Sequence, residues 1–200
     1  LKIRYHAIEP GVLFEDDTFQ LIVFPVTHRG PDCYGYTFQE KARRPFLVEQ
    51  AEALGVPAGP VRRRLVQGET ITLEDGRIVH PDDVLGPPRP GAKLVFVGDA
   101  GRVDDLVDAA RAADALVIEA TYCQEEADMA RKFGHLTAAQ AAWLAREAEV
   151  KLLILTHISR RYHPKDVLAE AQPIFKNTVV ANDFDRFRVV RKKEAGSGDQ

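Results

Sequence analysis

The second half of this 200-residue chain alternates short apolar segments with amphipathic ones, and this alternation restricts the fold more than any other feature. The apolar segments, typical of buried strands, are 94–97, 115–118, 151–155 and 178–181. The segments with helical spacing are 103–113, 124–133, 137–149 and 164–172. Strands interleaved with helices predict an α/β fold in which helices pack on a sheet.

The first forty residues predict strands alone. Segments 11–14 and 19–26 flank the turn-forming residues 15–18, which predicts a hairpin. Segment 34–39 predicts a third strand, in which Gly35 permits close approach of a neighbouring group.

Segment 41–90 has a different character. It predicts short helices at 46–54 and 61–66, a hairpin over 70–79, and a rigid Gly- and Pro-rich connector at 86–91. Because it has few large apolar residues for its length, we interpret it as an excursion from the core and not as a domain.

Composition excludes several classes of protein. Lys and Arg total 27 against 30 Asp and Glu, so a net charge of −3 does not indicate a nucleic-acid partner. No apolar run reaches the ~20 residues that a membrane span needs. The two cysteines, Cys33 and Cys123, are too few for a disulfide framework or a cysteine-based zinc site, and we expect a reducing cytoplasm.

A local basic cluster lies in segment 41–90, where Arg62, Arg63 and Arg64 follow the earlier pair Arg43 and Arg44. A charge run is usually a solvated face. On an arm that extends from an otherwise acidic chain, it is also suited to contacts with phosphate.

Acidic and histidine residues stand where several predicted strands end. Asp99, Glu119 and His157 follow the strands at 94–97, 115–118 and 151–155, and His28 follows the strand at 19–26. Such residues meet at one edge of an α/β sheet, and carboxylate with imidazole suits zinc or manganese. The alternatives are an aspartate that caps a helix and histidines with a structural role.

His135 lies just before the predicted helix 137–149, for which Thr137 is the expected N-cap. The positive end of that helix would favour the neutral imidazole. A capping or surface histidine is the alternative interpretation.

Together these motifs resemble the ribonuclease Z family, tRNA 3′-end endonucleases of the metallo-β-lactamase superfamily. The resemblance runs from about residue 8 to residue 187, and the order and spacing of its motifs make it specific. The motifs are Gly11-Val12, Pro25-Val26-Thr27-His28, Tyr34-Gly35-Tyr36, Gly86-Pro87-Pro88, Phe96-Val97-Gly98-Asp99, Glu119-Ala120-Thr121, Gly134-His135-Leu136-Thr137, Thr156-His157-Ile158-Ser159-Arg160-Arg161-Tyr162 and Ala181-Asn182-Asp183-Phe184.

The resemblance implies a role for each matching residue. His28 resembles a ligand of one metal, His157 a ligand of a second, and Asp99 the carboxylate that bridges both. Glu119 and His135 resemble the pair that stabilises the scissile phosphate and protonates the leaving oxygen. Asp183 resembles a residue that supports the site from behind the ligands. The arm implied by Gly59 and Pro60, with Arg62, Arg63 and Arg64, would grip tRNA.

The implied fold is an αββα sandwich that is incomplete in its N-terminal half. We expect residues 1–40 to end the first half, 41–80 to form the inserted arm, 81–190 to form the second half, and 191–200 to be a tail. The His-x-His-x-Asp-His run of the superfamily is absent, so we expect the chain to be inactive unless a missing N-terminal segment is supplied in cis or in trans. Ala100 and Leu136 replace the Thr and Ser usual in the family.

The expected function of the intact protein is removal of the 3′ trailer from precursor tRNA by zinc-dependent phosphodiester hydrolysis. We expect two zinc ions, with manganese as an alternative, a homodimer, and a cytoplasmic location without a membrane. The alternative functions are another phosphodiesterase or hydrolase of this fold, and a catalytically degenerate tRNA-binding scaffold.

Overall fold

The computed structural model describes residues 3–190, which form two compact units. The sheet unit joins Leu1–Lys41 to Ala92–Gln200, and the insert unit is Ala42–Gly91. The predicted tail, 191–200, lies outside the described residues. Within 3–190, no helix is both long and apolar enough to cross a membrane.

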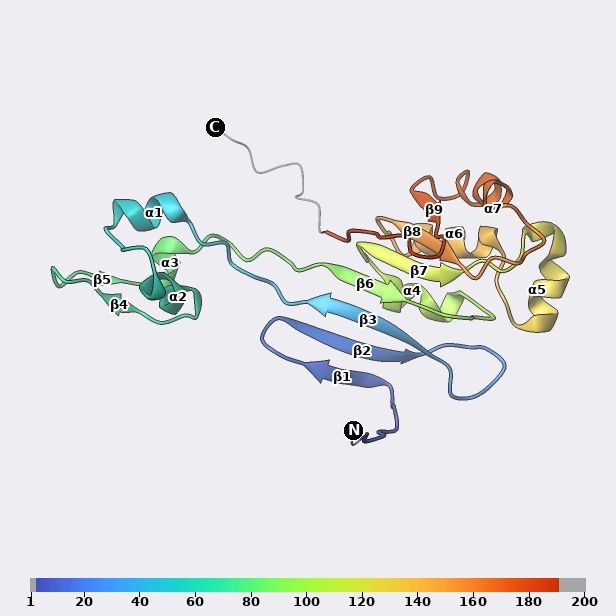
Figure 1. The fold of residues 1–200 in the computed structure, drawn as a ribbon, viewed down its shortest axis with the longest axis horizontal. Coiled ribbons are helices and arrows are strands. Elements are labelled where there is room, and N and C mark those ends of the chain that lie inside the picture. Colours follow the sequence, from blue (N-terminus) through green and yellow to red (C-terminus); the bar gives the residue numbers. More distant parts are fainter. Residues whose placement is uncertain (1–2, 191–200) are drawn as a thin grey trace. The chain divides into compact units, whose positions relative to one another are not determined.

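The sheet unit contains a seven-stranded mixed sheet (Figure 1). Its strands, in spatial order, are β1 (Gly11–Glu15), β2 (Phe19–Pro25), β3 (Tyr34–Glu40), β6 (Lys93–Phe96), β7 (Ala115–Glu119), β8 (Leu153–Thr156) and β9 (Thr178–Val180). Strands β1, β2, β3 and β6 pair antiparallel, whereas β6 to β9 are parallel. The α/β fold and the N-terminal hairpin are confirmed.

Helical segments connect the parallel strands. They are a 3-10 turn, Asp104–Leu106, with α4 (Val107–Ala110); a second 3-10 turn, Gln124–Glu126, with α5 (Ala127–Phe133); α6 (Ala138–Glu147); and α7 (Pro164–Ala171). The continuous helix predicted at 103–113 is wrong, because Arg111 leaves the helix and Ala112 takes a left-handed φ of 54°. The predicted N-cap is confirmed, since the Thr137 hydroxyl accepts a bond from the Gln140 amide.

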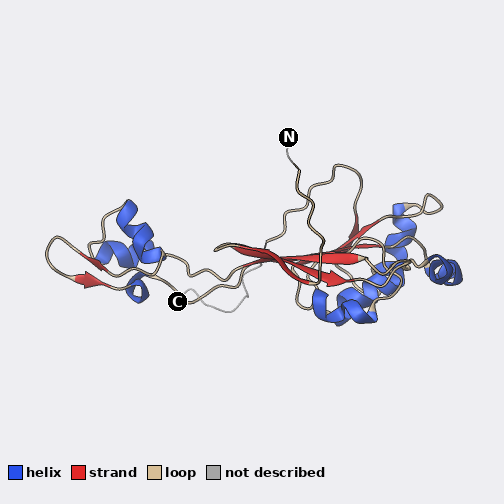
Figure 2. Ribbon diagram, turned by 90° about the horizontal axis from the view of Figure 1, so that it is seen from below, coloured by secondary structure: helices blue, strands red, loops and turns tan. Residues whose placement is uncertain are grey.

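The helices of the sheet unit gather on one face of its sheet (Figure 2). Apolar side chains on that face, such as Val95, Leu116 and Leu153, are fully buried with Leu144 of α6 in one core cluster. Burying this face stabilises the unit, because each large aliphatic side chain removed from water contributes about 1.5–3 kcal/mol.

The opposite face of the sheet is also apolar, but no helix covers it among residues 3–190. Phe96 of β6 is 49% exposed there, opposite Tyr36 of β3 and Val117 of β7 in the strand register. On the helix side, Gly35 lies across from Phe24, and a Cβ atom at Gly35 would stand 2.4 Å from the Phe24 ring. The expected close approach at Gly35 is therefore confirmed.

The insert unit has a small core of its own. Its elements are α1 (Val48–Ala53), α2 (Pro60–Val66), β4 (Ile71–Thr72), β5 (Ile78–Val79) and α3 (Pro81–Val84). Its buried apolar residues are Ala51, Val56, Leu65, Ile71, Val79, Val84 and Leu85. With Val84 and Leu85 in this core, the unit runs to Gly91, past the expected end of the arm at residue 80.

Candidate active site

The residues expected to carry chemistry meet where the parallel strands of the sheet end. Asp99 follows β6, Glu119 is the last residue of β7, and His157 follows β8 directly. Since these strands are parallel neighbours, their carboxyl ends share one edge. His135, from the turn between α5 and α6, joins them, and ligand atoms of Asp99, His135 and His157 all lie within 4.8 Å of one another.

The Asp99 carboxylate lies between two imidazoles. Its Oδ1 is 3.5 Å from His157 Nε2, and its Oδ2 is 3.9 Å from His28 Nε2. The Asp99 side chain is 40% exposed, so both oxygens remain accessible to a ligand. One carboxylate with an imidazole beyond each oxygen is the arrangement needed to bridge two cations.

His28 is held by the turn that follows α5. Its Nδ1 lies 2.7 Å from the Gly134 carbonyl, which can only accept, so Nδ1 donates to that carbonyl and Nε2 faces Asp99. Arg29 Nε donates to the Phe133 carbonyl at 2.8 Å. Gly134 itself has a φ of 69°, and a Cβ there would come within 3.4 Å of His28 Nδ1.

Glu119 is completely buried and fully hydrogen-bonded. Oε1 accepts from the Ala100 amide at 2.8 Å and from His135 Nδ1 at 2.9 Å. Oε2 accepts from the Leu136 amide and from both the amide and the hydroxyl of Thr121. Glu119 therefore fixes the His135 tautomer and leaves His135 Nε2 free for a proton or a ligand.

Two departures from the family pattern contact Glu119 through the backbone. Ala100 and Leu136 have buried side chains that pack in the core, and each donates its amide hydrogen to Glu119. A hydroxyl at either position is not required for these bonds. The Glu119–His135 pair is complete without them.

His157 has a left-handed backbone, with a φ of 53°. This conformation is uncommon for a residue other than glycine and persists only where the surroundings enforce it. The next turn is anchored, because the Ser159 amide donates to the Thr121 carbonyl at 3.2 Å. Strained backbone at a strand end is typical of a functional residue.

Residues 66–158 match the Beta-lactamase superfamily domain. The ribonuclease Z of Bradyrhizobium sp. (strain ORS 278) is 49% identical over 189 residues, which are 94% of this chain and 63% of that protein. The ribonuclease Z of Synechocystis sp. (strain ATCC 27184 / PCC 6803 / Kazusa) is 43% identical over 199 residues. That alignment covers 96% of this chain and 61% of that protein.

This chain is a homologue of ribonuclease Z. It spans about three fifths of the length of these curated relatives. Solved structures show the same fold: the metallo-beta-lactamase fold protein YhfI of Bacillus subtilis has a TM-score of 0.56 at 16% identity, covering 88% of this chain and 50% of that one. The human tRNase Z short form has a TM-score of 0.52 at 22% identity, and the match covers 89% of this chain and 45% of that one. The expected family and metallo-β-lactamase fold are confirmed.

The donor set of this ribonuclease Z homologue fits metal binding in part. Asp99 with His28 and His157 supplies the hard-to-borderline atoms that zinc and manganese take. Behind His135, Glu119 forms the carboxylate–histidine pair that orients imidazoles in metal sites. A hydrolytic zinc ion normally has three or more protein ligands, so these residues supply only part of a metal site.

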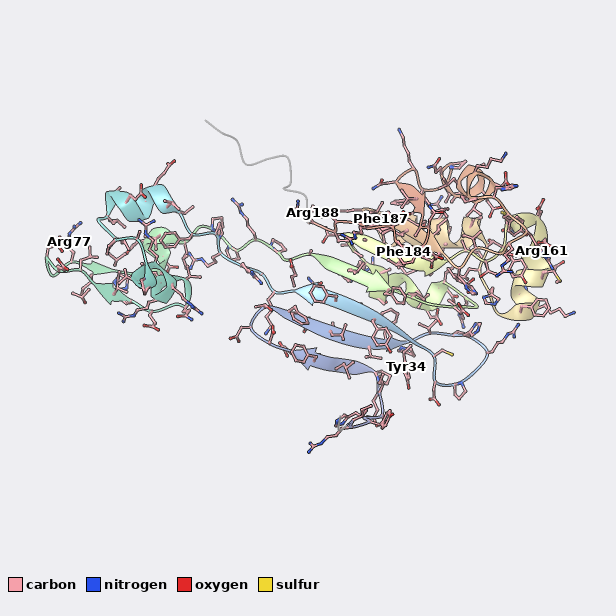
Figure 3. The ribbon with its side chains drawn as sticks, in the orientation of Figure 1. Tyr34, Arg77, Arg161, Phe184, Phe187 and Arg188 are labelled. Atoms are coloured by element: carbon pink, nitrogen blue, oxygen red, sulfur yellow. The ribbon has the colours of Figure 1, made fainter. Side chains whose placement is uncertain are left out.

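Asp183 makes no hydrogen bond or ion pair with the candidate ligands among residues 3–190. Within the described part of the chain its carboxylate makes no hydrogen bond or ion pair, and it lies exposed in a turn closed by a bond from the Asn182 amide to Asp185. The adjacent Phe184 is 99% exposed (Figure 3). A supporting role for Asp183 stays a prediction.

The three arginines of α2 have different environments. Arg62 donates to the Val56 carbonyl at 3.1 Å and lies over the Phe46 ring. Arg64 pairs with Glu69 at 2.8 Å. Arg63 is exposed and has no such partner among residues 3–190. The helix begins one residue before the predicted start at Val61, with Gly59 at its N-cap (φ 121°) and Pro60 as its first residue.

Sequence reasoning missed the residues that hold the candidate ligands. Arg29 adjoins His28 in the sequence. Its position next to a predicted ligand at a strand end was the signal that could have identified it as a supporting residue. Glu126 contacts Arg161 and Tyr162, which lie 35 and 36 residues along the chain, and no local pattern marks it.

Proposed function

We propose that this chain forms the bridging-ligand and proton-transfer part of an endonuclease that removes the 3′ trailer from precursor tRNA. The observation that carries the proposal is the placement of Asp99 between His28 and His157, beside the buried Glu119–His135 pair. Identity of 40–49% with proteins named ribonuclease Z supports the same assignment.

The residues of the chain divide the chemistry between them. His28, Asp99 and His157 would hold divalent ions, which supply activation of the attacking water and neutralisation of phosphate charge. His135, fixed by Glu119, presents Nε2 to the phosphate and delivers a proton to the oxygen that leaves. Cleavage after the discriminator nucleotide leaves a 3′-hydroxyl on the tRNA and a 5′-phosphate on the trailer.

We propose that His28, Asp99 and His157 would hold two zinc ions, with manganese as an alternative, and that Asp99 would be a ligand of both. These donors would give each ion only part of its coordination, and we propose that a segment outside these 200 residues would supply the rest. The open apolar face around Tyr36 and Phe96 is where a second β layer of the sandwich would pack. The segment that forms this layer, supplied in cis or in trans, would provide the remaining metal ligands.

The insert unit is the proposed tRNA contact. Arg63, whose charge is free of a partner among the described residues, is better placed than Arg62 or Arg64 to meet phosphate. Gly59 and Pro60 shape the turn that presents it. A homodimer in the cytoplasm, and support of the site by Asp183, complete the proposal.

The experiment joins the chain to the N-terminal part of the Bradyrhizobium ribonuclease Z that precedes the matched region. The fusion should release the trailer from a labelled precursor tRNA, and Asp99→Ala should abolish release. Deleting 42–91 should abolish tRNA cleavage but spare a small chromogenic phosphodiester. A fusion that cleaves the small ester alone, with or without the insert unit, would overturn the assignment of substrate.

A further inference from the structure

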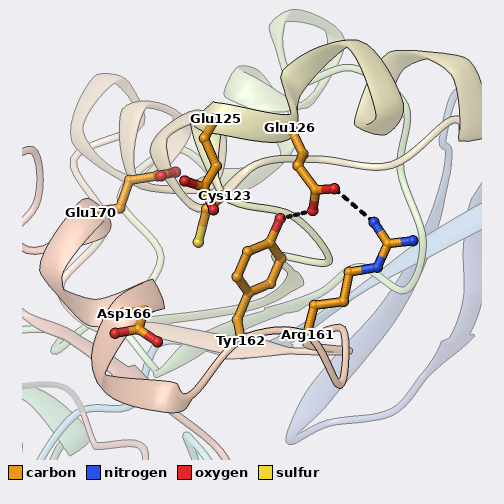
Figure 4. Close-up of a pocket in the computed structure, with 7 residues that line it drawn as sticks. All are labelled: Cys123, Glu125, Glu126, Arg161, Tyr162, Asp166 and Glu170. Carbon is orange, nitrogen blue, oxygen red and sulfur yellow. Dashed lines mark hydrogen bonds and ion pairs between the residues drawn. The ribbon is translucent and has the colours of Figure 1, made fainter.

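Glu126 receives two consecutive residues of the loop that begins at His157. Its Oε1 accepts from Arg161 Nη1 at 2.7 Å, and its Oε2 accepts from the Tyr162 hydroxyl (Figure 4). These groups line a cavity of about 610 Å³ near the start of α5. One carboxylate therefore attaches the end of the loop 157–162 to the segment that follows β7.

The loop is restrained at two places. It begins at the left-handed His157, its middle is held by the bond from the Ser159 amide to the Thr121 carbonyl, and its end is held by Glu126. A left-handed residue relaxes toward ordinary backbone when its neighbours permit this. Removing the Glu126 contacts at the end of the loop would allow His157 to turn away from Asp99.

The hydroxyl that Glu126 holds is a firm donor. Burial, together with the hydrogen bond to Glu126, raises the pKa of Tyr162 to about 12, so this phenol stays protonated through the neutral range. The ring also packs against the core of the sheet unit. The contact is thus a lasting anchor for the loop.

We propose that Glu126 is a positioning residue, which holds the His157 loop so that His157 Nε2 faces Asp99. The proposal rests on the proposed function, in which His157 is a metal ligand. Another carboxylate of the cavity has a different use: Glu170 accepts from the amides of Gln124 and Ala139. Glu125 lines the same cavity and is exposed, but it makes no hydrogen bond or ion pair with the loop among residues 3–190, which makes it a matched control.

The test is a Co²⁺ titration of the 200-residue chain to millimolar concentration, followed by paramagnetic broadening of the His157 ring signals. Glu126→Ala should raise the midpoint about tenfold, as loss of an orienting partner does in metal sites. Glu126→Gln, whose amide oxygen still accepts from Tyr162, should restore most of the affinity, and Glu125→Ala should leave it unchanged. The proposal is overturned by an unchanged midpoint in Glu126→Ala, an equal shift in Glu125→Ala, or an unbroadened His157 in the parent chain.

A second measurement tests the proposal with a milder variant, in case Glu126→Ala fails to fold. Tyr162→Phe removes one donor only, and it should speed amide exchange at Ser159 several-fold while exchange within β8 stays the same. Equal rates at Ser159 in this variant and the parent would also overturn the proposal. Failure of the proposed function can be told apart from failure of this inference. If the fusion never cleaves precursor tRNA but the Co²⁺ midpoints of the variants keep the expected order, the proposed function is refuted and the positioning role of Glu126 is not.

Discussion

The sheet unit and the insert unit use charged residues in opposite ways. In the sheet unit, Glu119 is buried and every lone pair faces a donor, so backbone amides dictate the geometry of His135. In the insert unit, Arg63 is exposed, whereas Arg62 donates to the Val56 carbonyl and lies over the Phe46 ring. The comparison teaches that backbone hydrogen bonds fix the geometry of the candidate active site. The candidate binding surface depends instead on which arginines have no acidic partner.

The largest effect should come from Glu119→Ala. It leaves the buried amides of Ala100 and Leu136 without an acceptor, and each costs about 1–3 kcal/mol. We expect a loss of about 4 kcal/mol in the free energy of unfolding, measured by urea denaturation with the fluorescence of Trp143 on α6 as reporter. Glu125→Ala is the control, and a loss as small as the control's would show that the buried carboxylate is dispensable.

The next effect tests whether the insert unit has an independent core. Leu65→Ala removes a fully buried side chain of that core and should cost about 3 kcal/mol there. Amide exchange within α1 and α2 should accelerate, while the Trp143 transition stays unchanged. If both units lose stability together, their separation into two cores is incorrect.

Gly134→Ala should have a smaller effect on folding. The left-handed φ of 69° costs an alanine about 1 kcal/mol. The new Cβ also presses on His28 Nδ1, so Co²⁺ broadening of the His28 ring should weaken. Gly76→Ala, at a φ of 85° in the insert unit, is a matched control that should leave the His28 signals unaltered.

The smallest effects separate the arginines of the insert unit. Arg63→Ala should change stability by less than about 0.5 kcal/mol yet reduce the salt dependence of tRNA binding by about one unit of slope. Arg62→Ala should destabilise the insert unit by about 1 kcal/mol, because it removes packing on Phe46 and a bond to Val56. Filter binding across salt concentrations and amide exchange measure the two effects. A reversed pattern would contradict the assignment.

Much of the sheet unit could be predicted from the sequence, because strand periodicity and strand-end residues are local signals. They located Asp99, Glu119 and His157 at one edge. The broken helix after Val103 was not predictable from spacing, since Ala112 leaves the helix to donate to the Ala148 carbonyl. A contact to a distant backbone group overrode a correct apolar pattern.

The insert unit was harder to predict for a related reason. Its core is made of a few side chains contributed by short elements, so no single stretch shows strong periodicity. The supports of the site, Arg29 and Glu126, act through contacts 104 and 35 residues along the chain. Residue types at strand ends indicate chemistry, but only the fold shows what holds them in place.

The central claim is that Asp99 is the shared ligand of a metal site that this chain holds only in part. Calorimetric titration of zinc into the 200-residue chain tests it most directly. The account predicts weak binding, with a dissociation constant above about 1 μM, that is lost in Asp99→Ala, since only Asp99 and one histidine are the proposed ligands of each ion. Tight stoichiometric binding of two ions, or binding that survives Asp99→Ala, would contradict it.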